Sequence, residues 1–336
     1  MNMPRHRGIV TEARMTVMEP GTLTNTVHVR HTFSVWLQAL RVHFVPCSVL
    51  PATLGTVIAW SRFGLFHAGD FFLVLFAVTV NYFGLAMMDD VFDYLQAVDR
   101  LSGDGKNPYS GGSGVLTSGA LKPVQMLRAA AFCFTLVAII GFYFVFTKGW
   151  PILLFGIIGL FSSIFYTAPP VRFGYRGFGE AGLLVNFGPV IGLGAFFVQT
   201  GTLAWEPFTA SLALGFMMWS MIIINEIPDY EEDRCGGKWN LVARFGREKG
   251  IWLFTAGLAA AYLTIVLSVA SGMSPLPALL GLSSVPLALR CVRILRERYT
   301  DRVGMWPANH AMVQVHALTA LGLIAGYLLA GLHPGS

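Results

Sequence analysis

Nine apolar stretches divide this sequence, and each is long enough to cross a lipid bilayer as a helix. A backbone inside hydrocarbon must satisfy its own hydrogen bonds, which restricts long apolar spans to helices. Hydrophobic residues make up 54% of the chain and charged residues 12%, against about 25% charged residues in soluble domains. We therefore predict an all-α, polytopic membrane bundle of about nine transmembrane helices. The predicted spans are 34–60, 70–92, 124–146, 150–168, 180–200, 206–228, 250–270, 274–292 and 311–331.

The basic residues are distributed unevenly between the two ends of these spans. With the N-terminus in the cytoplasm, all of the 23 Lys and Arg residues except Arg62 and Lys148 fall on the cytoplasmic side. Cytoplasmic loops of membrane proteins carry such an excess, which predicts a multi-pass protein of the cell membrane surrounded by lipid. Because the charges are spread over separate loops, nucleic-acid binding is disfavoured. Residues 1–33 are polar and are expected to form a disordered cytoplasmic tail before one membrane domain at 34–336.

Two polar clusters rich in carboxylates close long apolar stretches at this same end. The first contains Asp89, Asp90, Asp93 and Asp99, and the second contains Asn225, Asp229 and Asp233. Most members recur three or four positions apart and so share one face of a helix. Carboxylates at membrane depth are costly and indicate function, although a solvated helix end is the plainer alternative. Their similar placement predicts two pseudo-repeated halves that aim hard oxygen ligands at one Mg²⁺ site, where the metal would bridge to phosphate.

Basic and aromatic side chains follow both clusters. Lys106 lies in a glycine-rich loop after the first, and Lys238 and Arg244 follow the second. We expect these charges to neutralise phosphate oxygens. Arg172 is either an anchor at the membrane interface or a substrate contact. Tyr166 is either an interfacial aromatic or a ring whose face stabilises a cation.

Three further polar residues are interpreted as structural. Arg41 stands at the start of the first predicted span, where it is expected to act as an anchor. His310 and His316 open the last span without a partner at metal-ligand spacing. Both are therefore expected to be hydrogen-bonded histidines at a helix end.

The two clusters and the segment after the second resemble the motifs of a known family. The motifs are Asp90-x2-Asp93-x5-Asp99, Asn225-x3-Asp229-x3-Asp233-Arg234, and Gly237-Lys238-x2-Leu241-x2-Arg244-x-Gly246. They are similar to those of the UbiA-type intramembrane prenyltransferases, and within that family to the menaquinone branch, which prenylates 1,4-dihydroxy-2-naphthoate. The likeness runs from about residue 34 to 331. It departs from the pattern at three positions, where Asp89, Ala97 and Asn240 replace Asn, Gly and Thr.

The resemblance implies a reaction and roles for these residues. Asp90, Asp93, Asp229 and Asp233 would hold Mg²⁺ on the diphosphate of an isoprenyl donor, with Asn225, Asp89 and Asp99 as further ligands or supports. Asp93, Asp229, Lys238 and Tyr166 would act in catalysis, and Lys106, Arg172, Lys238, Arg244 and Asn225 would contact the diphosphate. The allylic C–O bond ionises, and a carbon of an aromatic acceptor attacks the cation. The oligomeric state stays open.

Two other functions fit parts of the same pattern. Intramembrane acids and internal repeats also occur in transporters, but here the acids lie at helix ends rather than in the middle of a span. A prenyltransferase with another acceptor, such as hydroxybenzoate, haem or a glycerol-phosphate lipid, would carry the same motifs.

Overall fold

The computed structural model describes residues 33–96, 98, 107 and 109–332, and all regular structure in these residues is helical. The predicted tail therefore lies almost wholly outside the described residues. Eight segments within them are long and apolar enough to span a membrane, and a ninth apolar helix, α5, is shorter. The helices are α2 (Pro46–Phe63), α3 (Ala68–Leu95), α4 (Pro123–Lys148), α5 (Pro151–Phe165), α6 (Gly179–Val185), α7 (Ile191–Thr200), α8 (Trp205–Glu226), α9 (Tyr230–Cys235), α10 (Leu241–Phe245), α11 (Arg247–Ala270), α12 (Val285–Arg298) and α13 (Trp306–Leu332). The predicted all-helical bundle of about nine spans is confirmed.

The first predicted span is wrong in its first part, because the helix is interrupted there. Residues 33–39 are helical, but Arg41 adopts a left-handed backbone with φ of 45°. The spanning segment is Val42–Phe63, in which a short 3-10 turn precedes α2. Pro46 occupies the first position of α2, where its missing N–H costs nothing, whereas inside a longer helix it would remove a hydrogen bond. The break turns Arg41 from an anchor at the end of a helix into a residue of the bundle interior.

The fifth span is continuous in space but is built from three pieces. A π-helical segment, Asn186–Val190, joins α6 to α7. It contains Pro189, which has no N–H to give to the helix ladder. A wide turn of this kind accommodates the missing bond and is frequent near functional sites.

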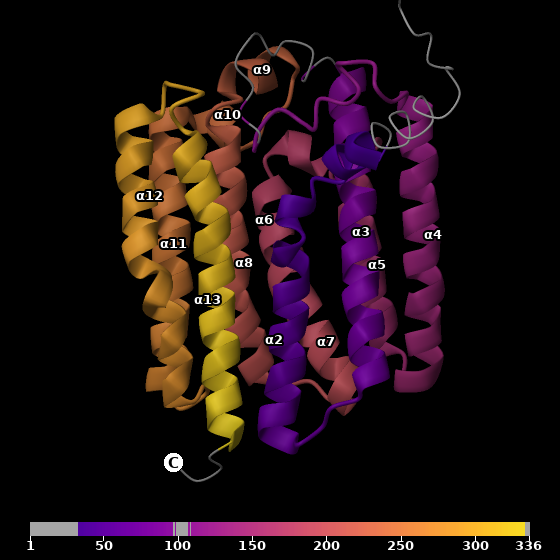
Figure 1. Ribbon diagram of the computed structural model, residues 1–336, viewed down its shortest axis with the longest axis vertical. Helices are drawn as coiled ribbons and strands as arrows, with labels where there is room; N and C mark the ends of the chain where they lie inside the picture. The colour runs from indigo at the N-terminus through magenta and orange to yellow at the C-terminus, as the bar shows by residue number, and fades with distance from the viewer. Residues whose placement is uncertain (1–32, 97, 99–106, 108, 333–336) are drawn as a thin grey trace, which may run out of the picture.

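The helices alternate in direction, so their ends form two distinct faces (Figure 1). The C-terminal ends of α3 and α8 lie at one face together with α9 and α10, whereas α13 ends at the opposite face. Arg62 and Lys148, the two basic residues that the sequence places apart from the rest, both pair with acids. Arg62 Nη2 lies 2.8 Å from Glu206 Oε1, and Lys148 Nζ lies 2.5 Å from Asp70 Oδ2.

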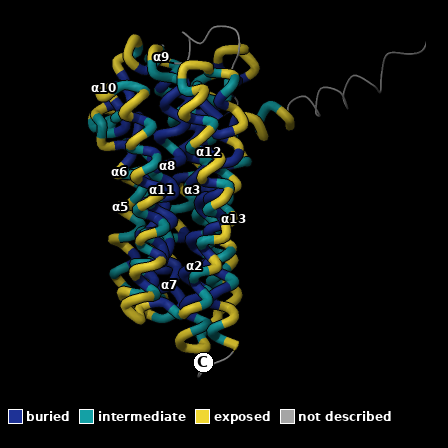
Figure 2. Tube along the Cα trace, turned by 90° about the vertical axis from the view of Figure 1, so that its left-hand side faces the viewer, coloured by how far each residue is buried: buried dark blue, intermediate teal, exposed yellow. Residues whose placement is uncertain are grey.

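Small residues bring the helices of the interior together. A Cβ at Gly55 of α2 would lie 2.0 Å from the carbonyl oxygen of Gly192 in α7, so these two backbones are in direct contact. Close approach through glycine is typical of helix packing in membranes. The buried residues run down the centre of the bundle (Figure 2), while large apolar side chains such as Phe146 and Trp252 are exposed at its periphery. With this surface and these spans, the chain is an integral multi-pass membrane protein.

Candidate active site

A cavity of about 120 Å³ opens where the ends of α3 and α8 face one another. Both polar clusters contribute to its wall, so the structure brings together two sequence segments separated by more than a hundred residues. The polar and charged residues that line it include Asp89, Asp93, Asn225, Glu226, Asp229, Glu232, Asp233, Arg41, Lys238 and Arg302. The rest of the wall is largely apolar and includes Leu85, Phe187, Met218 and Met221.

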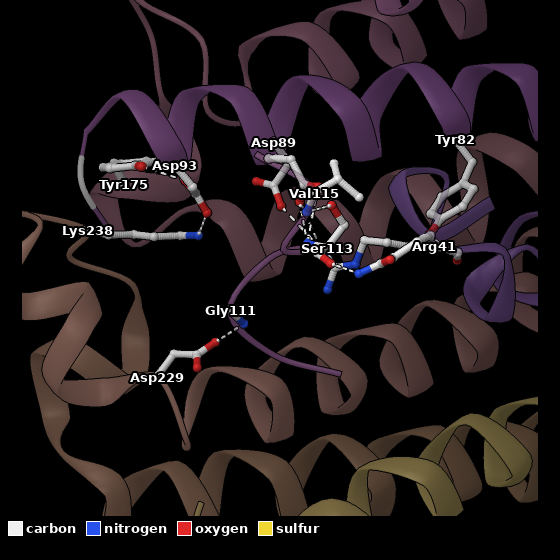
Figure 3. Close-up of polar contacts among 12 residues, drawn as sticks. Arg41, Tyr82, Asp89, Asp93, Gly111, Ser113, Val115, Tyr175, Asp229 and Lys238 are labelled. Carbon is white, nitrogen blue, oxygen red and sulfur yellow. Dashed lines mark hydrogen bonds and ion pairs between the residues drawn. The ribbon is translucent and has the colours of Figure 1, made fainter. Parts of the chain in front are cut away.

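Asp93 of the first cluster accepts hydrogen bonds from two side chains (Figure 3). Tyr175 donates its hydroxyl proton to Asp93 Oδ1 over 2.5 Å, and Lys238 Nζ donates to Oδ2 over 2.7 Å. The two donors come from the loop after α5 and the loop after α9. Asp93 is thereby fixed in orientation at the wall of the cavity.

Asp89 and Asp90 point in different directions although they are adjacent. Asp89 lines the cavity 3.8 Å from Arg41, and its buried Oδ1 has no hydrogen-bond partner among the described residues. Asp90 is not among the lining residues. Its two oxygens accept from the backbone N–H of Ser113, over 3.1 and 3.2 Å. Asp90 therefore holds the glycine-rich loop rather than facing the cavity.

The described part of this glycine-rich loop is clamped between the two clusters (Figure 3). Ser113 donates to Asp90, and the N–H of Gly111 donates to Asp229 Oδ2 over 2.8 Å. Gly111 and Gly112 both have positive φ, of 69° and 68°, which only glycine adopts without strain. The glycines thus allow one short segment to turn its N–H groups toward Asp90 on α3 and Asp229 in the turn between α8 and α9. Lys106 and Asp99, predicted as a diphosphate contact and a metal ligand, lie outside the described residues.

Three side chains from outside the second cluster hold it, two of them from distant parts of the chain. Arg302 Nη2 donates to Asp229 Oδ1 over 3.0 Å. Asn240 Nδ2 donates to Asp233 Oδ2 over 2.6 Å, and Asn309 Nδ2 donates to Asn225 Oδ1 over 2.8 Å. Burial raises the pKa of Asp229 to about 6 despite the nearby Arg302 guanidinium, and it raises the pKa of Asp233 well above its usual range. The negative charge here is incompletely compensated by protein cations.

Lys238 and Tyr166 also line the cavity, as expected. Burial disfavours the charged form of Lys238, but Asp93, Asp89 and Asp233 outweigh it and raise the pKa of Lys238 well above its ordinary value. Lys238 is therefore an ammonium. Burial raises the pKa of Tyr166, which keeps it a neutral phenol beside the cavity.

The structure does not bring the predicted diphosphate contacts Arg172 and Arg244 to the cavity. Arg172 Nη1 donates to Gln96 Oε1 over 2.9 Å, which ties the loop after α5 to the end of α3. Arg244 donates to the carbonyl oxygens of Trp239 and Arg176, over 2.8 and 2.9 Å. Both guanidiniums brace loops around the site and are not among the residues that line it.

The sequence did not reveal several residues of the site, and the prediction for one histidine is wrong. Glu226 and Glu232 also line the cavity, and Tyr175 donates to Asp93. Arg41 and Arg302 line the cavity, and Asn309 supports Asn225. Arg41 could have been found, because it is the one Asp, Glu, Lys or Arg residue within 34–60. His310 is hydrogen-bonded as predicted, with Nδ1 2.5 Å from the Tyr109 hydroxyl. His316 is not, since both ring nitrogens are buried and lack a partner among the described residues.

The donor atoms suit magnesium bound together with a phosphate group. No three His, Cys, Asp or Glu side chains in the described part of the chain converge as a complete metal cage. Mg²⁺ commonly binds through only one or two carboxylates, with phosphate oxygens and water completing its shell. The unpartnered Asp89 Oδ1 and the raised pKa values of Asp229 and Asp233 both indicate carboxylates that a cation would stabilise.

Comparison with known proteins identifies the family. Residues 48–313 match the UbiA prenyltransferase family, which is most of the 336-residue chain. This chain belongs to the UbiA prenyltransferase family. The predicted resemblance and the predicted enzyme class, a prenyltransferase, are confirmed.

Relatives and solved structures agree with this membership. The 2-carboxy-1,4-naphthoquinone phytyltransferase of Synechocystis is 24% identical over 90% of this chain and 95% of its own. The 1,4-dihydroxy-2-naphthoate octaprenyltransferase of Bacillus subtilis is 25% identical over 76% of this chain and 80% of its own. A UbiA homolog from Archaeoglobus fulgidus, solved with DMAPP and Mg²⁺, shares the fold with a TM-score of 0.59 at 16% identity, over 86% of this chain and 99% of that one.

The contacts of Asn240, which departs from the family motif and donates to Asp233, generate a prediction. Asn240 also begins α10, where its Oδ1 accepts from the N–H of Ala243 over 2.7 Å. Asn240→Leu removes this cap and the donor to Asp233, and should lower prenyl transfer about 10- to 100-fold, the usual effect of losing a partner of a metal ligand. Asn240→Thr, the family residue, should recover most of that loss because a hydroxyl can accept and donate at once.

The measurement is the initial rate at saturating donor, together with Mg²⁺ titration of each variant. Thermal unfolding in the same detergent controls for stability. Wild-type Mg²⁺ dependence in Asn240→Leu would show that the contact with Asp233 is not needed.

Proposed function

We propose that this protein transfers an isoprenyl chain from an allylic diphosphate to an aromatic acceptor, with 1,4-dihydroxy-2-naphthoate as the acceptor. The observation that carries the proposal is that two carboxylate-bearing helix ends face one cavity, which Lys238 also lines while bonded to Asp93. The acceptor is supported by the names of several relatives, among them the naphthoate octaprenyltransferases of Bacillus subtilis, Mycobacterium tuberculosis and Escherichia coli. The Mg²⁺ requirement is supported by the solved homolog that holds DMAPP and Mg²⁺.

The residues divide into a polar and an apolar part of the site. Asp89, Asp93, Asn225, Asp229 and Asp233 would hold Mg²⁺, which when bound neutralises the diphosphate and stabilises it as a leaving group. Lys238 is positioned to donate to diphosphate oxygens from the same wall. In this assignment Asp90 supports the site by holding Ser113.

The apolar wall protects the carbon chemistry. When the C1–O bond of the donor breaks, both electrons leave with the diphosphate and an allylic cation remains. The face of the Tyr166 ring stabilises positive charge, and Leu85, Phe187 and Met218 exclude water that would quench it. A ring carbon of the acceptor then forms the new C–C bond, and the acceptor loses its carboxylate as CO₂.

The reaction and its acceptor can be tested together. Purified protein with Mg²⁺, an isoprenyl diphosphate and a panel of aromatic acids should yield a prenylated naphthalene-1,4-diol from dihydroxynaphthoate, as identified by mass spectrometry of the lipid extract. EDTA should abolish the product, and added Mg²⁺ should restore it. Asp93→Ala and Asp229→Ala should each lower turnover by more than about 100-fold, since even outer partners of metal ligands contribute roughly 10- to 100-fold.

Glu297→Gln is the matched control, because Glu297 is exposed on α12 and carries the same charge. Product formation in EDTA, or full activity of both aspartate variants, would refute the metal site. Efficient prenylation of a different acid, with none of dihydroxynaphthoate, would refute the acceptor alone.

We further propose that the cavity opens to the cytoplasm from the cell membrane. The support is the concentration of Lys and Arg at the end of the bundle that contains the cavity. Isoprenyl diphosphates are charged, so a bilayer is a barrier to them. An inward-facing site gives them direct access from the compartment in which soluble donors are made.

Single-cysteine labelling tests this orientation in a background that lacks Cys47, Cys133, Cys235 and Cys291. Ser118 lies exposed at the cavity end, and Thr202 lies exposed at the other end. A cysteine at Thr202 should react with a membrane-impermeant maleimide in intact cells, whereas one at Ser118 should react only after permeabilisation. The reverse pattern would overturn the orientation.

A further inference from the structure

Arg302 joins the second cluster to a part of the chain that contains none of the family motifs. It lies in the turn between α12 and α13, and its guanidinium lines the cavity. Nη2 donates to Asp229 Oδ1 over 3.0 Å, and Nη1 donates to Glu232 Oε1. The side chain is 20% exposed, so the pair is largely withdrawn from solvent.

Hydrogen bonds hold the backbone around Arg302, whereas one N–H group of its side chain has no acceptor among the described residues. Met305 N donates to Asp301 O over 3.0 Å, and Asn107 Nδ2 reaches Arg302 O over 3.4 Å. Arg302 Nε is buried and has no partner within the described part of the chain. A buried donor without an acceptor is costly, which indicates that these contacts leave part of the guanidinium's bonding capacity unused.

Each oxygen of Asp229 already accepts a hydrogen bond, so a metal ion bound there would compete with the donors that now hold the carboxylate. Oδ1 accepts from Arg302, and Oδ2 accepts from the N–H of Gly111. The Gly111 contact comes from the backbone, whereas the Arg302 contact comes from the end of a long, rotatable side chain. A cation at Asp229 would also repel the guanidinium. The hydrogen bond from Arg302 is therefore the one that we expect metal binding at Asp229 to break.

We propose that Arg302 exchanges partners during substrate binding. In the empty site it neutralises Asp229 and Glu232, and on loading it moves its guanidinium from Asp229 to the oxygens of the isoprenyl diphosphate. The planar guanidinium suits this second role, because it can donate two parallel hydrogen bonds to a phosphate. Lys238 would contact the same diphosphate from its place beside Asp93, the other cluster. This inference rests on the proposed function and assigns a positioning residue to it.

If Arg302 exchanges partners, its substitution should have opposite effects on the binding of Mg²⁺ and on the binding of the diphosphate. Arg302→Gln removes a cation that competes with metal, so Mg²⁺ alone should bind about 3- to 10-fold more tightly, which is a modest electrostatic gain. The same variant should bind a non-reactive isoprenyl thiolodiphosphate, in saturating Mg²⁺, about 10- to 100-fold more weakly, as expected for losing hydrogen bonds to a charged group. Both affinities are measured by isothermal titration on the purified full chain in detergent.

Two further variants make the result specific. Arg296→Gln removes the same charge from an exposed position on α12 and should change neither affinity. Arg302→Lys keeps the charge but loses the two-pronged geometry. It should bind Mg²⁺ as the wild type does and the diphosphate more weakly, which provides a test even if Arg302→Gln fails to fold.

The outcomes separate this inference from the function on which it rests. If the wild-type protein binds no thiolodiphosphate in Mg²⁺, the proposed function falls and the exchange falls with it. If the wild type binds it and Arg302→Gln leaves its affinity unchanged, only the exchange is overturned. A loss of both affinities in Arg302→Gln would show a structural role and would also overturn it.

Discussion

The structure depends on the cost of burying carboxylates at the end of a membrane bundle. Asp93 and Asp233 are almost fully buried, and each would be strongly destabilising without partners. The chain supplies donors to them from the loops around the site: Lys238 and Tyr175, both distant in sequence, to Asp93, and the nearby Asn240 to Asp233. These hydrogen bonds hold the loops against the helix ends. They leave the negative charge only partly compensated, so the same arrangement that shapes the site also makes it attractive to a divalent cation.

The helical scaffold gives these contacts their geometry. α3 and α8 run in the same direction and present their polar ends to one cavity, while the glycine contacts between α2 and α7 bring the surrounding spans close together (Figure 1). The apolar wall below the carboxylates continues the bundle interior. One cavity thereby has a charged end, suited to a diphosphate, and a hydrocarbon-like end, suited to a prenyl chain and its cation. That division matches the chemistry of an intramembrane prenyltransferase.

Local periodicity predicted the helices and the shared face of Asp89 and Asp93. It was wrong for the second cluster, because α8 ends at Glu226 and Asp229 lies in the turn before α9. It also failed wherever long-range contacts decide where a side chain lies. Asp90 was expected to act with Asp93, three positions on. Asp89 and Asp93 instead share the cavity face, and Asp90, one residue and about 100° further round the helix, turns to Ser113. Arg172 and Arg244 are basic and lie near the motifs. Arg172 nevertheless donates to the side-chain amide of Gln96, and Arg244 donates to backbone carbonyl groups. Arg302 and Asn309 carried no local signal, because their roles exist only once α13 packs beside α8.

The central claim is that both clusters hold metal on one diphosphate, and Mn²⁺ in place of Mg²⁺ tests it most directly. Electron–nuclear double resonance on the protein with Mn²⁺ and an isoprenyl thiolodiphosphate should show a ³¹P coupling typical of phosphate bound directly to the ion. Asp93→Ala and Asp229→Ala should each weaken or abolish that coupling, although Asp93 lies on α3 and Asp229 lies in the turn between α8 and α9. A ³¹P coupling of undiminished strength in either variant, or bound Mn²⁺ without any such coupling in the wild-type protein, would contradict a site shared by the two clusters.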